Sequence, residues 1–190
     1  MNEFNSPLWV NVEHREEIGD WLNRHFLTGA AAEIGCAYGG YARQVLSKWK
    51  GRTYYMVDPW VGQPATVYRE RTEGIDFEQY WRECCQLAEA DPRVKLIRKF
   101  STAAALDIPD ASLDMVFIDA NHAYGQVLAD LDAWWPKVKV GGVMGLHDYG
   151  NDTNWPNFCE VKRAVDRWCS ERQIVFVYDR SNSVWILKRS

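Results

Sequence analysis

Apolar positions along this chain follow two patterns, short buried runs and longer stretches with a helical period. The short runs predict strands at 30–34, 53–57, 94–97, 113–118, 143–146, 174–178 and 184–187. The helical period predicts helices at 13–27, 41–50, 77–90, 126–135 and 159–170, and a short helix that starts at Ser101. Strands that alternate with helices predict a mostly parallel sheet with helices on both faces.

The last two predicted strands add a hairpin to this sheet. The two final strands are joined by 179–183, which predicts a hairpin that places an antiparallel strand at or near one edge. We therefore predict an α/β fold with a Rossmann-like, doubly wound, mostly parallel seven-stranded sheet and a C-terminal antiparallel hairpin. We expect one domain over 1–190, with an N-terminal helical segment at 1–28 and a substrate or lid insertion at 61–90.

Composition narrows the functional classes. Hydrophobic residues make up 47% and charged residues 25% of 190, as in ordinary globular proteins, and a net charge of −4 argues against a nucleic-acid partner. No stretch approaches the roughly 20 apolar residues that a membrane span needs, and no secretory signal begins the chain. We expect a cytoplasmic protein without membrane or nucleic-acid partners. The five cysteines lack Cys-x-x-Cys spacing, so we expect free thiols.

A glycine-rich turn follows the first predicted strand. Glu33 closes this strand, and Gly35, Gly39 and Gly40 carry the chain into the next helix. Glycines let the backbone approach a ligand closely, and a helix start offers free N–H groups to an anion. Acids recur at the ends of later strands, so we expect a small-molecule pocket at the carboxyl end of the sheet.

Four segments carry a family resemblance, namely 33–41 (Glu-Ile-Gly-Cys-Ala-Tyr-Gly-Gly-Tyr), 54–58, 113–122 and 141–149. With them the chain resembles class I S-adenosylmethionine-dependent methyltransferases over about 28–190. More narrowly, it is similar to catechol-type and natural-product sugar O-methyltransferases. One departure is Ala37, where many members have glycine. The resemblance implies S-adenosylmethionine as cofactor and methyl transfer to a hydroxyl of a small molecule.

The resemblance also implies where the cofactor binds. Asp58 would accept hydrogen bonds from both ribose hydroxyls, and Glu33 would orient the methionyl end. Backbone groups of the turn at Gly35, Cys36 and Gly39 would contact the cofactor.

Three further residues would complete this cofactor site. The backbone N–H of Tyr41 would meet the methionyl carboxylate, Trp60 would stack near the adenine, and Ser101 would bond the adenine edge. Ordinary loop packing is the alternative role for Trp60 and Ser101.

A second group combines acids and histidines. Asp119, His147 and Asp148 match three metal ligands of catechol-type enzymes, usually Asp, Asp and Asn around Mg²⁺. Imidazole suits Mn²⁺, Fe²⁺ or Zn²⁺ better than Mg²⁺, so His147 leaves the metal open between Mg²⁺, Mn²⁺ and others. Without a metal, Asp119 would help at the sulfonium and His147 would act as a base. His122 takes the place of a catalytic lysine and would accept the acceptor's proton.

Two rival functions share parts of this pattern. A non-catalytic module that binds S-adenosylmethionine or another nucleoside would need the same turn, as would an NAD-dependent oxidoreductase. Glu33, the irregular glycine spacing and the lack of a Tyr-x-x-x-Lys motif argue against the oxidoreductase. The identity of the small-molecule acceptor and the formation of a homodimer stay open.

Overall fold

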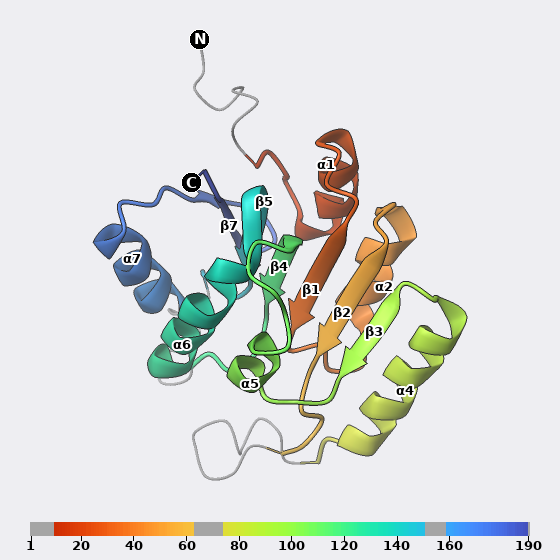
Figure 1. The fold of residues 1–190 in the computed structure, drawn as a ribbon. Helices are drawn as coiled ribbons and strands as arrows, with labels where there is room; N and C mark the ends of the chain where they lie inside the picture. The colour runs from red at the N-terminus through yellow and green to blue at the C-terminus, as the bar shows by residue number, and fades with distance from the viewer. Residues whose placement is uncertain (1–9, 63–73, 151–158, 190) are drawn as a thin grey trace.

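The computed structural model describes residues 10–62, 74–150 and 159–189, which form a seven-stranded sheet between two layers of helices (Figure 1). The strand order is β3-β2-β1-β4-β5-β7-β6. The bounds are β1 Ala30–Ile34, β2 Thr53–Val57, β3 Val94–Ile97, β4 Leu113–Ile118, β5 Val138–Leu146, β6 Val177–Tyr178 and β7 Val184–Leu187. Strands β1 to β5 pair in parallel, whereas β7 is antiparallel to both β5 and β6. The predicted fold class is confirmed.

Helices cover both faces of the sheet (Figure 1). One layer contains α5 (Ser101–Ala105), α6 (Tyr124–Trp134) and α7 (Val161–Glu171). The other contains α1 (Ile18–Arg24), α2 (Gly40–Lys48) and α4 (Phe77–Ala90). The 3₁₀ turns η2 (Arg15–Glu17) and η3 (Trp135–Lys137) precede α1 and β5. Strand order reverses between β1 and β4, which is where open α/β sheets bind ligands.

Three features of the composition can be compared with the structure. Six tryptophans are at most 1% exposed and fill the two apolar clusters: Trp21, Trp49, Trp60, Trp134, Trp168 and Trp185. The five cysteines are free thiols, as expected. Within the described ranges, no helix is both long and apolar enough to cross a bilayer.

The N-terminal helix is shorter than its apolar period suggested. The apolar period predicted a helix over 13–27, but α1 ends at Arg24 and Phe26 is 90% exposed. Phe26 has a φ of 58°, and the N–H of Leu27 donates to the carbonyl of Leu22 at 2.9 Å. The left-handed conformation of Phe26 therefore caps the C-terminus of α1, and the helix ends before Phe26.

Other elements also differ from the expected boundaries, among them β6, which covers only Val177–Tyr178 of the predicted 174–178. β5 begins at Val138 instead of 143, because the strand continues through Gly141 and Gly142 with an irregular register against β4. A Cβ at Gly142 would lie 2.8 Å from the carbonyl oxygen of Asp114, so only glycine fits there. In the expected lid at 61–90, residues 77–90 form α4, which packs beside β3, and 63–73 lie outside the described residues.

Candidate functional site

The glycine turn brings the ends of β1 and β4 into contact. The N–H of Asp119 donates to the carbonyl of Ile34 at 2.8 Å, and the N–H of Gly35 donates to that of Val57 at 2.8 Å. Gly35 has a φ of 85°, and a Cβ there would lie 2.2 Å from the carbonyl oxygen of Asp119. Both the backbone conformation and the space therefore require glycine at this position.

A cavity of about 250 Å³ opens beside this turn, at the carboxyl ends of β1, β2 and β4. Its lining combines two acids, Asp58 and Asp119, with three aromatic side chains, Phe77, Tyr80 and Phe100. Ser101, Thr102, Gln126 and Asp130 close the wall formed by α5 and α6. Its position at the switch point of the sheet makes it the candidate binding site.

Asp58 lines the cavity and also accepts hydrogen bonds from the backbone of the turn. Its Oδ2 accepts the N–H groups of Cys36 at 3.0 Å and Ala37 at 3.1 Å, and its Oδ1 accepts that of Trp60 at 2.7 Å. Burial raises the pKa of Asp58, although these three N–H groups oppose the rise. A carboxylate has about four acceptor positions, which leaves about one for a ligand hydroxyl.

Glu33 is buried under the turn. It is 2% exposed, and the Tyr54 hydroxyl donates to its Oε2 at 3.0 Å. Burial raises the pKa of Glu33 to about 8, with a further contribution from the charge of Asp119 and opposition from Tyr54 and Arg15. A cationic ligand group beside this carboxyl would favour its charged form.

The structure corrects the expected stacking role of Trp60. Its ring is 1% exposed, meets Trp81 edge-on at 4.7 Å and donates its Nε1–H to the carbonyl of Ala37 at 2.8 Å. Trp60 thus supports the turn from below, while Pro59 and Val61 line the cavity.

The backbone N–H and the side chain of Tyr41 have different roles. It lies in the first turn of α2, where N–H groups lack helical acceptors, so its N–H can meet an anion as expected. Its ring is buried against Phe117, and its hydroxyl donates to the carbonyl of Arg15 at 3.2 Å.

Ser101 lines the cavity through a small buried network. Its hydroxyl donates to Asp130 Oδ1 and accepts from Trp134 Nε1 at 2.9 Å. Burial raises the pKa of Asp130 to about 6, and the Ser101 hydrogen bond opposes this rise. Because the Ser101 proton is already donated, its side chain can only accept a further bond from a ligand.

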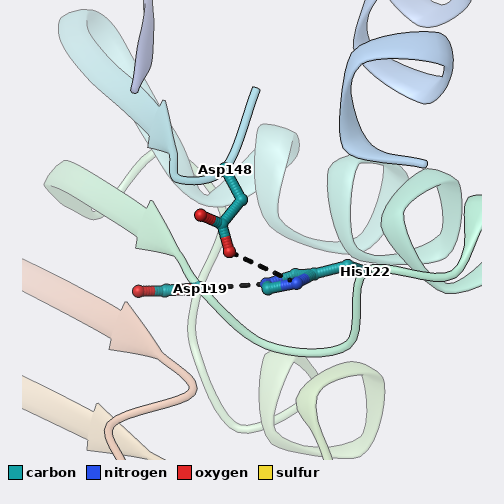
Figure 2. Close-up of side chains that lie close together, drawn as sticks. All are labelled: Asp119, His122 and Asp148. Atoms are coloured by element: carbon teal, nitrogen blue, oxygen red, sulfur yellow. Dashed lines mark ion pairs between the residues drawn. The ribbon is translucent and has the colours of Figure 1, made fainter. Parts of the chain in front are cut away.

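Beside the cavity, two aspartates and two histidines form a closed ring of contacts. His122 lies between Asp119 and Asp148, with its two nitrogens 3.4 Å from one oxygen of each (Figure 2). His147 Nδ1 lies 3.5 Å from Asp119 and 3.1 Å from Asp148. The structure therefore gathers all four of these predicted residues.

An unusual backbone conformation brings His147 and Asp148 to the same ring. Successive side chains of a strand point to opposite faces, so two neighbours would normally diverge. Asp148 leaves β5 with a φ of 61°, a left-handed conformation that a short polar residue tolerates. Both side chains consequently join the ring, His147 through its contact with Asp119 and Asp148 through its contacts with His122 and His147.

The charges of the ring residues shift one another's pKa values. Burial opposes the charge of Asp119, but His122 and His147 outweigh it and hold the pKa of this carboxyl well below its usual range. Burial likewise opposes the charge of His147, but Asp119 and Asp148 raise its pKa to about 9. The pKa of Asp148 is lowered because His147 and His122 outweigh its burial. His147 therefore carries a proton at neutral pH in this arrangement.

The ring has a donor set that fits a divalent cation. Ligand atoms of Asp119, His122 and Asp148 all lie within 4.8 Å of one another. Two carboxylates and an imidazole suit Mn²⁺, Fe²⁺ or Zn²⁺. The nitrogen donor of this group is His122, whereas the sequence had indicated His147, which lies next to it.

Two nearby tyrosines are engaged elsewhere. Tyr124 accepts a hydrogen bond from Arg167 at 2.9 Å, and Tyr149 donates one to Asp166 at 2.7 Å. Both hydroxyls are thus bound to α7.

Sequence reasoning missed two residues of the site, Arg15 and Asp130. Arg15 reaches Asp119 at 3.5 Å from the N-terminal segment, and no local pattern signals this long-range contact. Asp130 could have been found, because it is an acid between Val127, Leu131 and Trp134 on the buried face of α6.

Comparisons with known proteins agree with this geometry. The sequence profile of the methyltransferase domain family matches residues 32–149. An uncharacterized protein of Sinorhizobium fredii is 30% identical over 135 residues, which is 68% of this chain but only 14% of that protein's length.

Solved structures are similar over nearly the whole chain. The O-methyltransferase NovP superposes with a TM-score of 0.66 at 20% identity, covering 92% of this chain and 78% of its own. A candidate caffeoyl-CoA O-methyltransferase from Staphylococcus aureus has a TM-score of 0.66 at 15% identity, covering 94% and 86%. At these identities the likeness establishes the fold.

Proposed function

The chain belongs to the methyltransferase domain family, the class I S-adenosylmethionine-dependent methyltransferases, and from this premise we propose that it methylates a hydroxyl of a small molecule. The observation that supports this most is the position of the four-residue ring directly beside the cavity, with Asp119 in both. A donor in the cavity and an acceptor at the ring would be neighbours. Transfer of a methyl group depends mainly on such positioning.

In this proposal, different residues of the site bind different parts of the donor. Asp58 would accept a ribose hydroxyl, the backbone of the Gly35 turn would lie along the donor, and the buried Glu33 would act on its cationic methionyl end from beneath the turn. Ser101 and Asp130 form the polar wall for the adenine.

The ring would prepare the acceptor. A neutral imidazole can take the proton of a hydroxyl, and His122 is held by Asp119 and Asp148 on opposite sides. If Asp119, His122 and Asp148 held a divalent metal instead, the metal would lower the pKa of the acceptor hydroxyl, and His122 would serve as a ligand and not as the base. A bound S-adenosylmethionine would supply the methyl group and depart as S-adenosylhomocysteine, and His122, in the absence of a metal, would accept the proton of the hydroxyl.

The O-methyltransferase names of similar structures favour oxygen over nitrogen as acceptor. The test is a screen that follows release of S-adenosylhomocysteine with phenols, catechols, sugars, amines and thiols, with and without Mn²⁺ or Mg²⁺. We expect turnover with hydroxyl compounds, and turnover only with amines or thiols would contradict the proposal. Cofactor binding without turnover of any acceptor would instead favour the non-catalytic module.

The role of His122 is tested on the best acceptor. His122→Ala should lower kcat by about 10²-fold or more while cofactor affinity changes little, because base catalysis is typically worth this much. The control is His25→Ala, which removes an exposed histidine far along the chain. Unchanged turnover in His122→Ala would remove the assignment as base.

A further inference from the structure

Arg15 reaches the donor site from outside the region that matches the family. It begins η2, 17 positions before the matched residues 32–149. Its backbone is fixed on both sides, because its N–H donates to Ser181 Oγ at 3.3 Å and its carbonyl accepts from Tyr41 at 3.2 Å. The side chain is therefore presented from a fastened backbone.

The guanidinium group lies among the groups expected at the methionyl end. Its Nη1 is 3.5 Å from Asp119 Oδ2, and its central carbon is 5.1 Å from the centre of the Tyr41 ring. Its charge also acts on the buried Glu33 carboxyl, whose pKa it lowers. Arg15 thus contacts Asp119, which follows β4 and lines the cavity, and its charge acts on Glu33 of β1.

One nitrogen of this guanidinium, Nη1, has no hydrogen-bond acceptor in the described part of the chain, while Nε lies 3.7 Å from Glu16. Nη1 is buried, and within the described residues it makes no hydrogen bond, since the distance to Asp119 is too long. A buried charged donor without an acceptor is costly, so the site favours a ligand that supplies one.

The charges around Arg15 define that ligand. Asp119 would repel a simple anion, whereas a group with adjacent positive and negative charges suits both Arg15 and Asp119, and its cation would favour the charged form of Glu33. An α-amino acid is such a zwitterion, with an ammonium for the two acids and a carboxylate for the guanidinium. The N–H of Tyr41, in the first turn of α2, is a further donor without a helical acceptor.

We propose that Arg15 binds the α-carboxylate of the donor's amino acid group, so that the N-terminal segment completes the cofactor site. This inference rests on the proposed use of S-adenosylmethionine. It assigns the sequence before the family match a role in cofactor affinity.

The test compares two ligands that differ only in this carboxylate. S-adenosylhomocysteine and its decarboxylated analogue are titrated by calorimetry into the wild-type protein, Arg15→Gln and Arg15→Lys. The matched control is Arg24→Gln, because Arg24 is an exposed arginine at the end of α1. Such a cycle isolates the coupling between the side chain and the carboxylate.

We expect Arg15→Gln to weaken S-adenosylhomocysteine by about 10- to 100-fold, as for a charge-assisted hydrogen bond, and the decarboxylated analogue by less than about 2-fold. Arg15→Lys should lie between, since lysine keeps the charge without the two-pronged geometry. Equal losses for both ligands, or no loss for either, would overturn the inference while the proposed function stands. A wild-type protein that binds neither ligand would overturn both.

Discussion

The ionisation of the buried Asp130 should lower the free energy of unfolding by an amount that can be measured. It is 3% exposed, and burial raises its pKa from 3.8 to about 6. The folded protein therefore holds the Asp130 proton more tightly than the unfolded chain, so ionisation destabilises the fold as pH rises from about 4 to about 6. At 1.36 kcal/mol per pKa unit, the full penalty is about 3 kcal/mol, of which about 2 kcal/mol develops between pH 4.5 and 7.5.

Asp130→Asn removes this titration but keeps an oxygen that can accept the Ser101 hydroxyl. The free energy of unfolding, measured in urea at several pH values, should rise relative to wild type by about 2 kcal/mol between pH 4.5 and 7.5. The weaker hydrogen bond of a neutral acceptor adds an offset that does not depend on pH. Asp132→Asn, at an exposed acid of the same helix, is the control for loss of one charge. A constant difference between Asp130→Asn and wild type across this range would refute the reasoning.

Three other changes test the site. Gly35→Ala should cost about 3 kcal/mol or more in urea unfolding, because a Cβ in this left-handed conformation would strike the Asp119 carbonyl, and wild-type stability would contradict this. The stability advantage of wild type over His147→Gln should shrink, by up to about 3 kcal/mol, as pH rises from 7 to 10, because a pKa raised to about 9 stabilises the folded state only below that pH. Mn²⁺ at about ten times its Kd should stabilise the wild-type protein to heat by about 1.4 kcal/mol, and Asp148→Asn should lose this effect; equal shifts in both would remove the metal from the ring.

The strands were the most predictable part of the fold. The bounds of β1 to β4 and of β7 agree with the apolar runs, because a strand buried on both faces has few polar positions to blur its ends. β5 was too short in the prediction because Gly141 and Gly142 interrupt its apolar pattern. Helix ends depend on local caps, and the left-handed Phe26 is not a residue that the sequence marks as one.

The site was predictable as far as it follows from topology. Carboxyl ends of neighbouring parallel strands meet, so the grouping of Asp119 with His147 and Asp148 could be expected from sequence alone. The choice of His122 as the nitrogen closest to both carboxylates depends on side-chain directions, which the left-handed Asp148 alters. The position of Arg15 beside Asp119 depends on how the segment before α1 packs against the sheet, and the apolar periodicity does not predict this packing.

The central claim is that acids at the strand ends surround the sulfonium donor. Calorimetric titration of the purified protein with S-adenosylhomocysteine and, separately, NADH tests it most directly, with Asp58→Ala as the companion variant. We predict binding of S-adenosylhomocysteine, no binding of NADH, and a loss of about 10-fold or more in Asp58→Ala, as for a charge-assisted hydrogen bond. Preference for NADH, or no heat from S-adenosylhomocysteine at millimolar concentration, would contradict the account.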